Sequence, residues 1–170
     1  MSEQRPKIML KSASMIDWPM IRSWLALPEI QEWWGPLQTI EAEVMLALGS
    51  DHSICRIIES NGEPVGYGHA IDATVWSADL PQDLATGTWD IDLFIASERH
   101  RNLGIGAEAL QQLRDEVFRT SLAVAVCVFP SIANERAVRA YEKAGFKWKS
   151  VWRDPVNGPS WFMTADRPSV

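Results

Sequence analysis

The chain has 170 residues, of which 46% are hydrophobic, and its formal net charge is −6. This length suits one domain with a full core, and no apolar stretch approaches the ~20 residues of a membrane-spanning helix. The negative charge argues against a nucleic-acid-binding protein and mildly favours a small cationic ligand. We therefore expect a single domain over residues 1–170 with no membrane or nucleic-acid partner. The polar N-terminus lacks the apolar core of a signal peptide, which predicts a cytoplasmic location.

The first third of the chain predicts one strand and several short helices. Residues 7–11 are typical of a strand, and three helical segments are expected after it, over residues 18–25, 28–35 and 40–48. Asp17 and Thr39 stand where N-cap residues are expected, and Gly49 stands where the third helix should end.

A hairpin is predicted next. Two strand-like runs, residues 53–59 and 64–72, flank Asn61-Gly62, the strongest short hairpin signal that a sequence offers. The connection over residues 73–88 contains Trp76 and is long for a loop without a function.

A strand, a glycine-bearing loop and a helix follow each other from residue 89 to residue 120. Apolar residues alternate with Asp90 and Asp92 in the expected strand over residues 89–95. The loop contains Gly104 and Gly106 and leads into strong helix formers from Ala107 onward. The first turn of a helix leaves backbone N–H groups without partners, so this arrangement predicts an anion site, although the glycines could also serve only a tight turn. Neither the dinucleotide-binding pattern nor the nucleoside-triphosphatase pattern is matched.

The last third predicts a buried strand, a helix and a second hairpin. Residues 122–129 form a continuous apolar run, and Asn134 and Gly145 delimit a helix over residues 135–144. Strand-like segments over 146–152 and 160–164 flank a turn over 154–159. Cys55 and Cys127 lie inside predicted strands and are expected to be free buried thiols. These patterns alone predict an α/β or α+β domain with a phosphate-binding loop.

Two segments resemble the signatures of the GNAT superfamily of N-acetyltransferases. Residues 101–106 match R/Q-x-x-G-x-G/A, and residues 134–146 match N-x-x-A-x-x-x-Y-E-K-x-G-F at every fixed position. The resemblance implies an α+β fold in which helices flank a central, mixed but mostly antiparallel sheet. It also implies acetyl-CoA as co-substrate, without a metal. The residues expected to contact the coenzyme are Phe94, Ile95, Arg99, Arg101, Asn102, Leu103, Gly104, Ile105, Gly106 and Asn134.

The resemblance also implies candidate catalytic residues. Asp90 and Asp92 lie two residues apart on one strand and share a face, where they could bind an ammonium group and, in the case of Asp92, accept its proton. Tyr141 could donate its hydroxyl proton to the departing thiolate. Each has an alternative interpretation: the acids could form a solvated strand face, Tyr141 could pack in the core, and Asn134 could simply cap its helix.

The acceptor is the least determined feature. Trp33-Trp34-Gly35 and the segment over residues 61–67 look like aminoglycoside 6'-N-acetyltransferases, which cause antibiotic resistance, and like related siderophore-precursor acyltransferases. The resemblance implies that Trp33, Trp34, Asp90 and Asp92 bind the substrate, although the tryptophans could serve packing. The aminoglycoside enzymes tend to carry an acid where this chain has Phe129, which leaves room for a smaller amine.

Other functions stay open. They include acylation of a siderophore precursor, a protein or a peptide, and coenzyme A binding without catalysis. No role is assigned to His52, His69 or His100, whose spacing does not suggest a metal site. The sequence does not decide whether the protein forms a homodimer.

Overall fold

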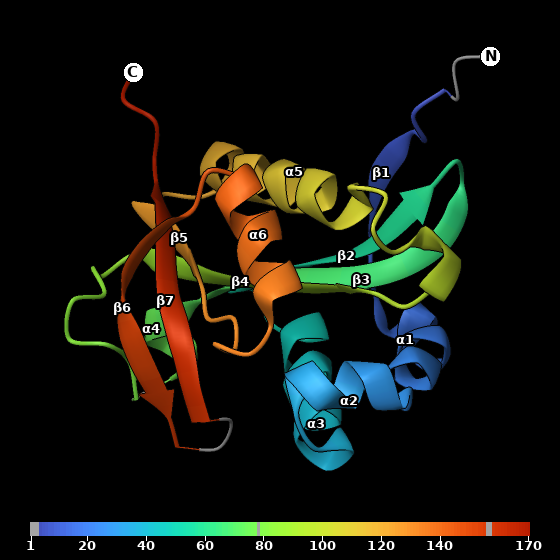
Figure 1. The fold of residues 1–170 in the computed structure, drawn as a ribbon, viewed down its shortest axis with the longest axis horizontal. Helices are drawn as coiled ribbons and strands as arrows, with labels where there is room; N and C mark the ends of the chain where they lie inside the picture. The colour runs from blue at the N-terminus through green and yellow to red at the C-terminus, as the bar shows by residue number, and fades with distance from the viewer. Residues whose placement is uncertain (1–3, 78, 156–157) are drawn as a thin grey trace.

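The computed structural model contains one seven-stranded sheet with the strand order β1-β2-β3-β4-β5-β7-β6 (Figure 1). It describes residues 4–77, 79–155 and 158–170. All neighbouring strands pair antiparallel except β4 and β5, which are parallel. The predicted mixed, mostly antiparallel sheet is therefore confirmed. The strands are β1 (Ile8–Ser12), β2 (Ser53–Ser60), β3 (Glu63–Asp72), β4 (Thr88–Ile95), β5 (Ala125–Val128), β6 (Lys147–Asp154) and β7 (Gly158–Asp166).

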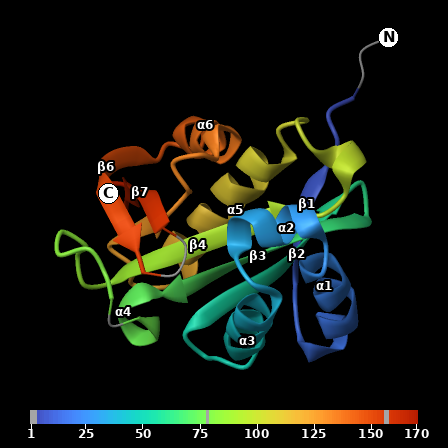
Figure 2. The ribbon, with the colours of Figure 1, turned by 60° about the horizontal axis from the view of Figure 1, so that its bottom comes forward.

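Helices cover both faces of the sheet. Figure 2 shows α5 and α6 on one side of the sheet, and α1 and α3 on the other. The helices are α1 (Trp18–Leu25), α2 (Pro28–Trp34), α3 (Leu37–Leu48), α4 (Ala73–Trp76), α5 (Ile105–Thr120) and α6 (Glu135–Lys143). None of these described helices is long and apolar enough to cross a membrane.

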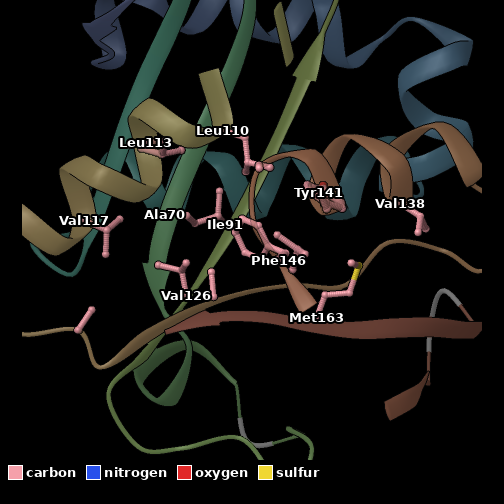
Figure 3. Close-up of a cluster of buried hydrophobic side chains, with 14 residues drawn as sticks. Ala70, Ile91, Leu110, Leu113, Val117, Val126, Val138, Tyr141, Phe146 and Met163 are labelled. Atoms are coloured by element: carbon pink, nitrogen blue, oxygen red, sulfur yellow. The ribbon is translucent and has the colours of Figure 1, made fainter. Parts of the chain in front are cut away.

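Each face of the sheet has its own hydrophobic core. Under α5 and α6, residues such as Ile91, Leu110 and Met163 are almost fully buried (Figure 3). Under α1, α2 and α3, the core includes Ile21, Leu25, Ile30, Ile40 and Tyr67. Cys55 and Cys127 are free and buried, as predicted.

Most predicted elements are present, but several of their ends differ from the predictions. The side chain of Asp17 does not cap α1; it accepts a hydrogen bond from the backbone N–H of Ser14 and so closes a preceding 3-10 turn. Thr39 lies inside α3, which begins at Leu37 after Pro36. Helix α5 begins at Ile105, two residues earlier than expected.

The predicted strand over residues 122–129 shortens to β5, because Leu122 and Val124 are exposed. The long connection after β3 contains the short helix α4. The predicted turn over residues 154–159 includes residues 156 and 157, which lie outside the described residues.

The parallel pair β4 and β5 creates the opening in which the site lies. Pairing between these strands runs from Thr88 opposite Ala125 to Asp90 opposite Cys127, and no later pair joins them. Strand β4 continues to Ile95 against β3 alone. The last residues of β4 therefore have no paired strand on the side of β5.

Candidate active site

A residue with a left-handed backbone conformation precedes α5 and shapes the loop at the end of β4. Gly104 has φ of 78° and precedes the first helical residue, Ile105, and no side chain caps this helix end. Since only glycine adopts this conformation readily, the exposed N–H groups of the first turn depend on it. The guanidinium of Arg101 donates to the carbonyls of Ile95 and Ala96 at 2.9 and 3.1 Å, which holds the loop against the end of β4.

A cavity of about 1060 Å³ opens in front of this loop. Its walls are the end of β4, the loop, the first turn of α5, part of α2 and one side of α6. Nine of the eleven residue positions predicted to contact a coenzyme or the reacting sulfur line it: Phe94, Ile95, Arg101, Asn102, Gly104, Ile105, Gly106, Asn134 and Tyr141. Arg136, Arg139 and Lys143 on α6 add positive charge to the same wall. Basic side chains and free backbone amides suit an anionic ligand such as a pyrophosphate.

Two other predicted coenzyme residues lie away from the cavity wall. Arg99 forms an ion pair with Glu63 of β3 and is exposed. Leu103 is 59% exposed. Neither residue lines the cavity.

A second, smaller cavity of about 80 Å³ adjoins the first and shares Trp33, Asn134, Ala137 and Tyr141 with it. Asp90, Asp92 and Phe129 form other parts of its wall. The structure thus brings both acids of β4 close to Tyr141, which comes from α6 about 50 residues later in the chain. Asn134 also caps α6, because its side-chain oxygen accepts a hydrogen bond from the N–H of Ala137 at 3.2 Å.

The two acids of β4 resist ionisation. Burial raises the pKa of Asp92 well above its usual range, and the charges of Asp90 and Glu43 raise it further. The N–H of Leu93, 3.0 Å from Asp92 Oδ1, acts in the opposite direction. Burial and the charge of Glu43 raise the pKa of Asp90 as well. A carboxylate with a raised pKa is a stronger base once it is ionised, which suits proton removal from an ammonium group.

Tyr141 keeps its proton under the same influences. Burial raises the pKa of its hydroxyl, and the charges of Asp92 and Asp90 raise it further. The side chain is 8% exposed and packs against Phe146, with 5.9 Å between the ring centroids. Tyr141 is therefore both part of the core and part of the wall that the two cavities share.

The two neighbouring tryptophans occupy different surroundings. Trp33 is 41% exposed and lines both cavities. Trp34 packs edge to face on Phe94, with 5.1 Å between ring centroids, and lies 5.6 Å from the ring of His69. Of this pair, only Trp33 is part of the cavity walls.

Two residues that the sequence analysis did not select lie beside the acids. His69 faces Asp92 across β3 and β4, and Glu43 reaches the same sheet face from α3. The sequence held no signal for them, because the register of β3 on β4 and the packing of α3 are long-range features. Within residues 4–77, 79–155 and 158–170, no group of three or more His, Cys, Asp or Glu side chains is arranged to hold a metal ion.

The chain is similar to known proteins in sequence and in fold. Residues 14–153 match the family described as "Acetyltransferase (GNAT) domain". An aminoglycoside N(6')-acetyltransferase type 1 of Klebsiella pneumoniae is 29% identical over 160 residues, which cover 89% of this chain and 79% of the relative.

Solved structures give the same result. The structure of AAC(6')-Ib with ribostamycin and coenzyme A has a TM-score of 0.83 and 27% identity, and the match covers 95% of this chain and 94% of that one. The structure of the aminoglycoside acetyltransferase AAC(6')-Ib with coenzyme A and kanamycin has a TM-score of 0.82 and 27% identity, with 95% of each chain covered.

Proposed function

The chain belongs to the GNAT family of acetyl-CoA-dependent N-acetyltransferases, and we propose that its acceptor is an aminoglycoside, acetylated at the 6'-amino group. The observation that carries this proposal is the meeting of two cavities at Tyr141. The large cavity is lined by the basic side chains of the loop and of α6 together with three glutamates, and the small cavity is lined by Asp90 and Asp92. The large cavity suits an anionic coenzyme, and the small one suits an ammonium group. The names of the related proteins point to the same acceptor class.

The related enzymes tend to carry an acid at the position of Phe129. In this chain, Asp90 of the neighbouring strand β4 places a carboxyl group at the same small cavity. Asp90 pairs with Cys127 of β5, two residues before Phe129, and both Asp90 and Phe129 line the small cavity. The ring of Phe129 itself stacks on Phe162, with 5.3 Å between centroids. The cavity therefore keeps two carboxylates despite the apolar residue, and this supports a polycationic acceptor.

The residues have distinct roles in this proposal. Acetyl-CoA supplies the thioester carbonyl that the amine attacks. The first turn of α5 and the basic side chains of α6 hold its phosphates. Asp90 and Asp92 bind the ammonium group of the acceptor, and Asp92 accepts the proton that this group must lose before attack. The hydroxyl of Tyr141 donates a proton to the departing thiolate and regains one from the second proton that the nitrogen loses as the amide forms.

The proposal is tested by measuring thiol release from acetyl-CoA with purified protein. Kanamycin and ribostamycin represent aminoglycosides, and spermidine, N-hydroxylysine and a lysine-containing peptide represent the other acceptor classes. We expect the highest kcat/KM with an aminoglycoside and a product acetylated at the 6'-amino group, as assigned by NMR. Turnover with one of the other acceptors alone would reassign the acceptor. Coenzyme binding without turnover of any amine would indicate a non-catalytic module.

A further inference from the structure

The two cavities meet at a short stretch of shared wall. Four residues line both cavities: Asn134, Ala137 and Tyr141, which belong to α6 and its N-cap, and Trp33, which belongs to α2. The three α6 positions are spaced by three and four residues, which places them on one side of the helix. On this side the small Ala137 leaves space between two larger side chains. These four residues form the junction of the two cavities.

The small cavity has little room beyond the junction. Its volume is about 80 Å³, against about 1060 Å³ for the large cavity. In the proposed function the amine enters the small cavity and the coenzyme occupies the large one, so the acyl carbon lies at the junction. A longer acyl chain would compete there with the amine on one side and with the arm of the coenzyme on the other. The width of the junction therefore limits the group that is transferred.

Most of the junction and the wall beyond it are held in place by packing. Tyr141 is 8% exposed and belongs to the core under α6. The side chain of Asn134 accepts a hydrogen bond from the N–H of Ala137. Phe129, in the wall of the small cavity, stacks on the fully buried Phe162. The α6 side of the junction is thus fixed by the fold itself.

Trp33 is the part of the junction that packing does not require. It is 41% exposed, whereas the neighbouring Trp34 packs among three other aromatic rings. Among the residues that the structure describes, no aromatic ring pairs with Trp33. A large side chain at this position narrows the junction and contributes little to the core. Its size therefore serves the site more than the fold.

We propose that Trp33 determines which acyl groups the protein transfers, because it narrows the junction so that an acetyl group fits and a longer chain does not. This inference rests on the proposed function and deepens it, since it assigns the donor specificity to one residue of α2. With any donor the amine nitrogen bonds to the acyl carbon and the carbon–sulfur bond breaks. The ammonium group loses two protons: Asp92 takes one, and the departing sulfur receives the other by way of Tyr141.

The test widens the junction in two steps, with Trp33→Phe and Trp33→Ala. Thiol release is measured with acetyl-, propionyl- and butyryl-CoA and with the acceptor on which the wild-type protein is most active. The wild type should prefer acetyl-CoA. In Trp33→Ala, the kcat/KM for butyryl-CoA relative to that for acetyl-CoA should rise roughly 10-fold or more, since a single methylene in a confined pocket is worth about that factor. Trp33→Phe should give an intermediate ratio.

Trp148→Ala is the matched control. Trp148 lies on β6, is 49% exposed and lines neither cavity, so its loss should leave the ratio of the two donors at the wild-type value. Partial unfolding or weaker acceptor binding lowers turnover with both donors alike and does not change this ratio. An unchanged ratio in Trp33→Ala, an equal rise in Trp148→Ala, or a wild-type protein that uses butyryl-CoA as well as acetyl-CoA would overturn the inference.

Donor affinity gives a second measurement that does not depend on the acceptor. Calorimetry without an amine should show a higher Kd for butyryl-CoA than for acetyl-CoA in the wild type, and the two values should converge in Trp33→Ala. If no aminoglycoside is acetylated, the proposed acceptor is wrong, and the affinities still decide on Trp33. Its role is retained if the Kd values converge and rejected if their ratio is the same in both proteins.

Discussion

Asp90 and Asp92 are carboxylates on a strand face where charge is costly. Both contribute to the small cavity, and the pKa of each is raised by burial and by neighbouring acids. Catalytic sites commonly keep such unfavourable residues because the chemistry requires them. Substitutions at these two positions should therefore separate activity from stability.

Asp92→Asn should lower kcat roughly 10²-fold or more, because the amide cannot accept the proton of the ammonium group. The KM of acetyl-CoA should stay close to the wild-type value, since Asp92 lies on the acceptor side. Steady-state thiol release measures both constants. Asp115→Asn, at an exposed residue of α5 that pairs with Arg114, is the control. Nearly normal turnover of Asp92→Asn would end its assignment as the base.

Asp90→Asn should raise the thermal stability of the protein near neutral pH. The pKa of Asp90 is higher in the folded protein than the ~3.9 of an unfolded chain. The free energy of unfolding therefore falls as the pH rises from the unfolded-state pKa to the folded-state pKa. Above the folded-state pKa, the full destabilisation by the charged side chain is present. Asparagine does not carry this cost.

The advantage of Asp90→Asn should accordingly shrink as the pH is lowered to about 4, near the unfolded-state pKa. Thermal unfolding of both proteins at pH 8 and at pH 4 measures the difference. A variant that is less stable than wild type at pH 8 would indicate that the native carboxylate is stabilised by hydrogen bonds that outweigh its burial.

Gly66 fixes the distance between β3 and β4 at the end that carries the coenzyme residues. A Cβ atom at position 66 would overlap the carbonyl oxygen of Phe94, and the backbone of Ile95 lies 3.1 Å from it. Gly66→Ala should therefore displace the end of β4, lower the unfolding free energy by about 1 to 3 kcal/mol and raise the KM of acetyl-CoA.

Gly49→Ala provides the matched control for Gly66→Ala. Gly49 follows α3, has φ of −96° and would place a Cβ 3.6 Å from the nearest atom, the carbonyl oxygen of Met45. Chemical denaturation and kinetics with varied acetyl-CoA measure the two effects. If both alanine variants behave alike, the close approach at Gly66 does not constrain the coenzyme site.

The elements were predictable from sequence where a local signal determines them. Asn61 and Gly62 both have positive φ, at 51° and 84°, as the predicted hairpin turn requires. Asn134 caps α6 as expected. The predictions failed where tertiary contacts decide: the side chain of Asp17 turns back to Ser14, and the exposure of Leu122 delays β5.

The site residues also fall into those that a local sequence pattern predicts and those that it does not. Asp92, Tyr141 and the loop over residues 101–106 stand in recognisable local patterns, and the structure brings them around the two adjoining cavities. Glu43 and His69 have no such pattern. Their position depends on which residue of β3 faces Asp92 and on how α3 packs over the sheet, and a single sequence specifies neither locally.

The molecule as a whole should become more stable when the coenzyme binds, because the large cavity is walled by elements that are distant in sequence. The end of β4, the first turn of α5, α6 and α2 all contribute to it. At a coenzyme A concentration about 100 times its Kd, linkage predicts ~2.7 kcal/mol, which corresponds to a rise in Tm of roughly 5 to 10 °C.

Thermal shift with increasing coenzyme A measures this effect, and adenosine alone is the control ligand because it lacks the pyrophosphate and the thiol arm. A shift that is as large with adenosine would show that the loop over residues 101–106 contributes little to binding.

The parting of β4 from β5 after Asp90 and Cys127 leaves a sheet edge inside the protein. Exposed edges attract other main chains, and interior backbone groups require hydrogen-bond partners. A donor molecule whose arm carries its own amide groups can pair with the last residues of β4 in the manner of an added strand, whereas a simple thioester cannot. The protein should therefore discriminate between acyl donors by their backbone-like linkages, and short acetyl thioesters without amides should be poor donors even when their acetyl groups are equally reactive.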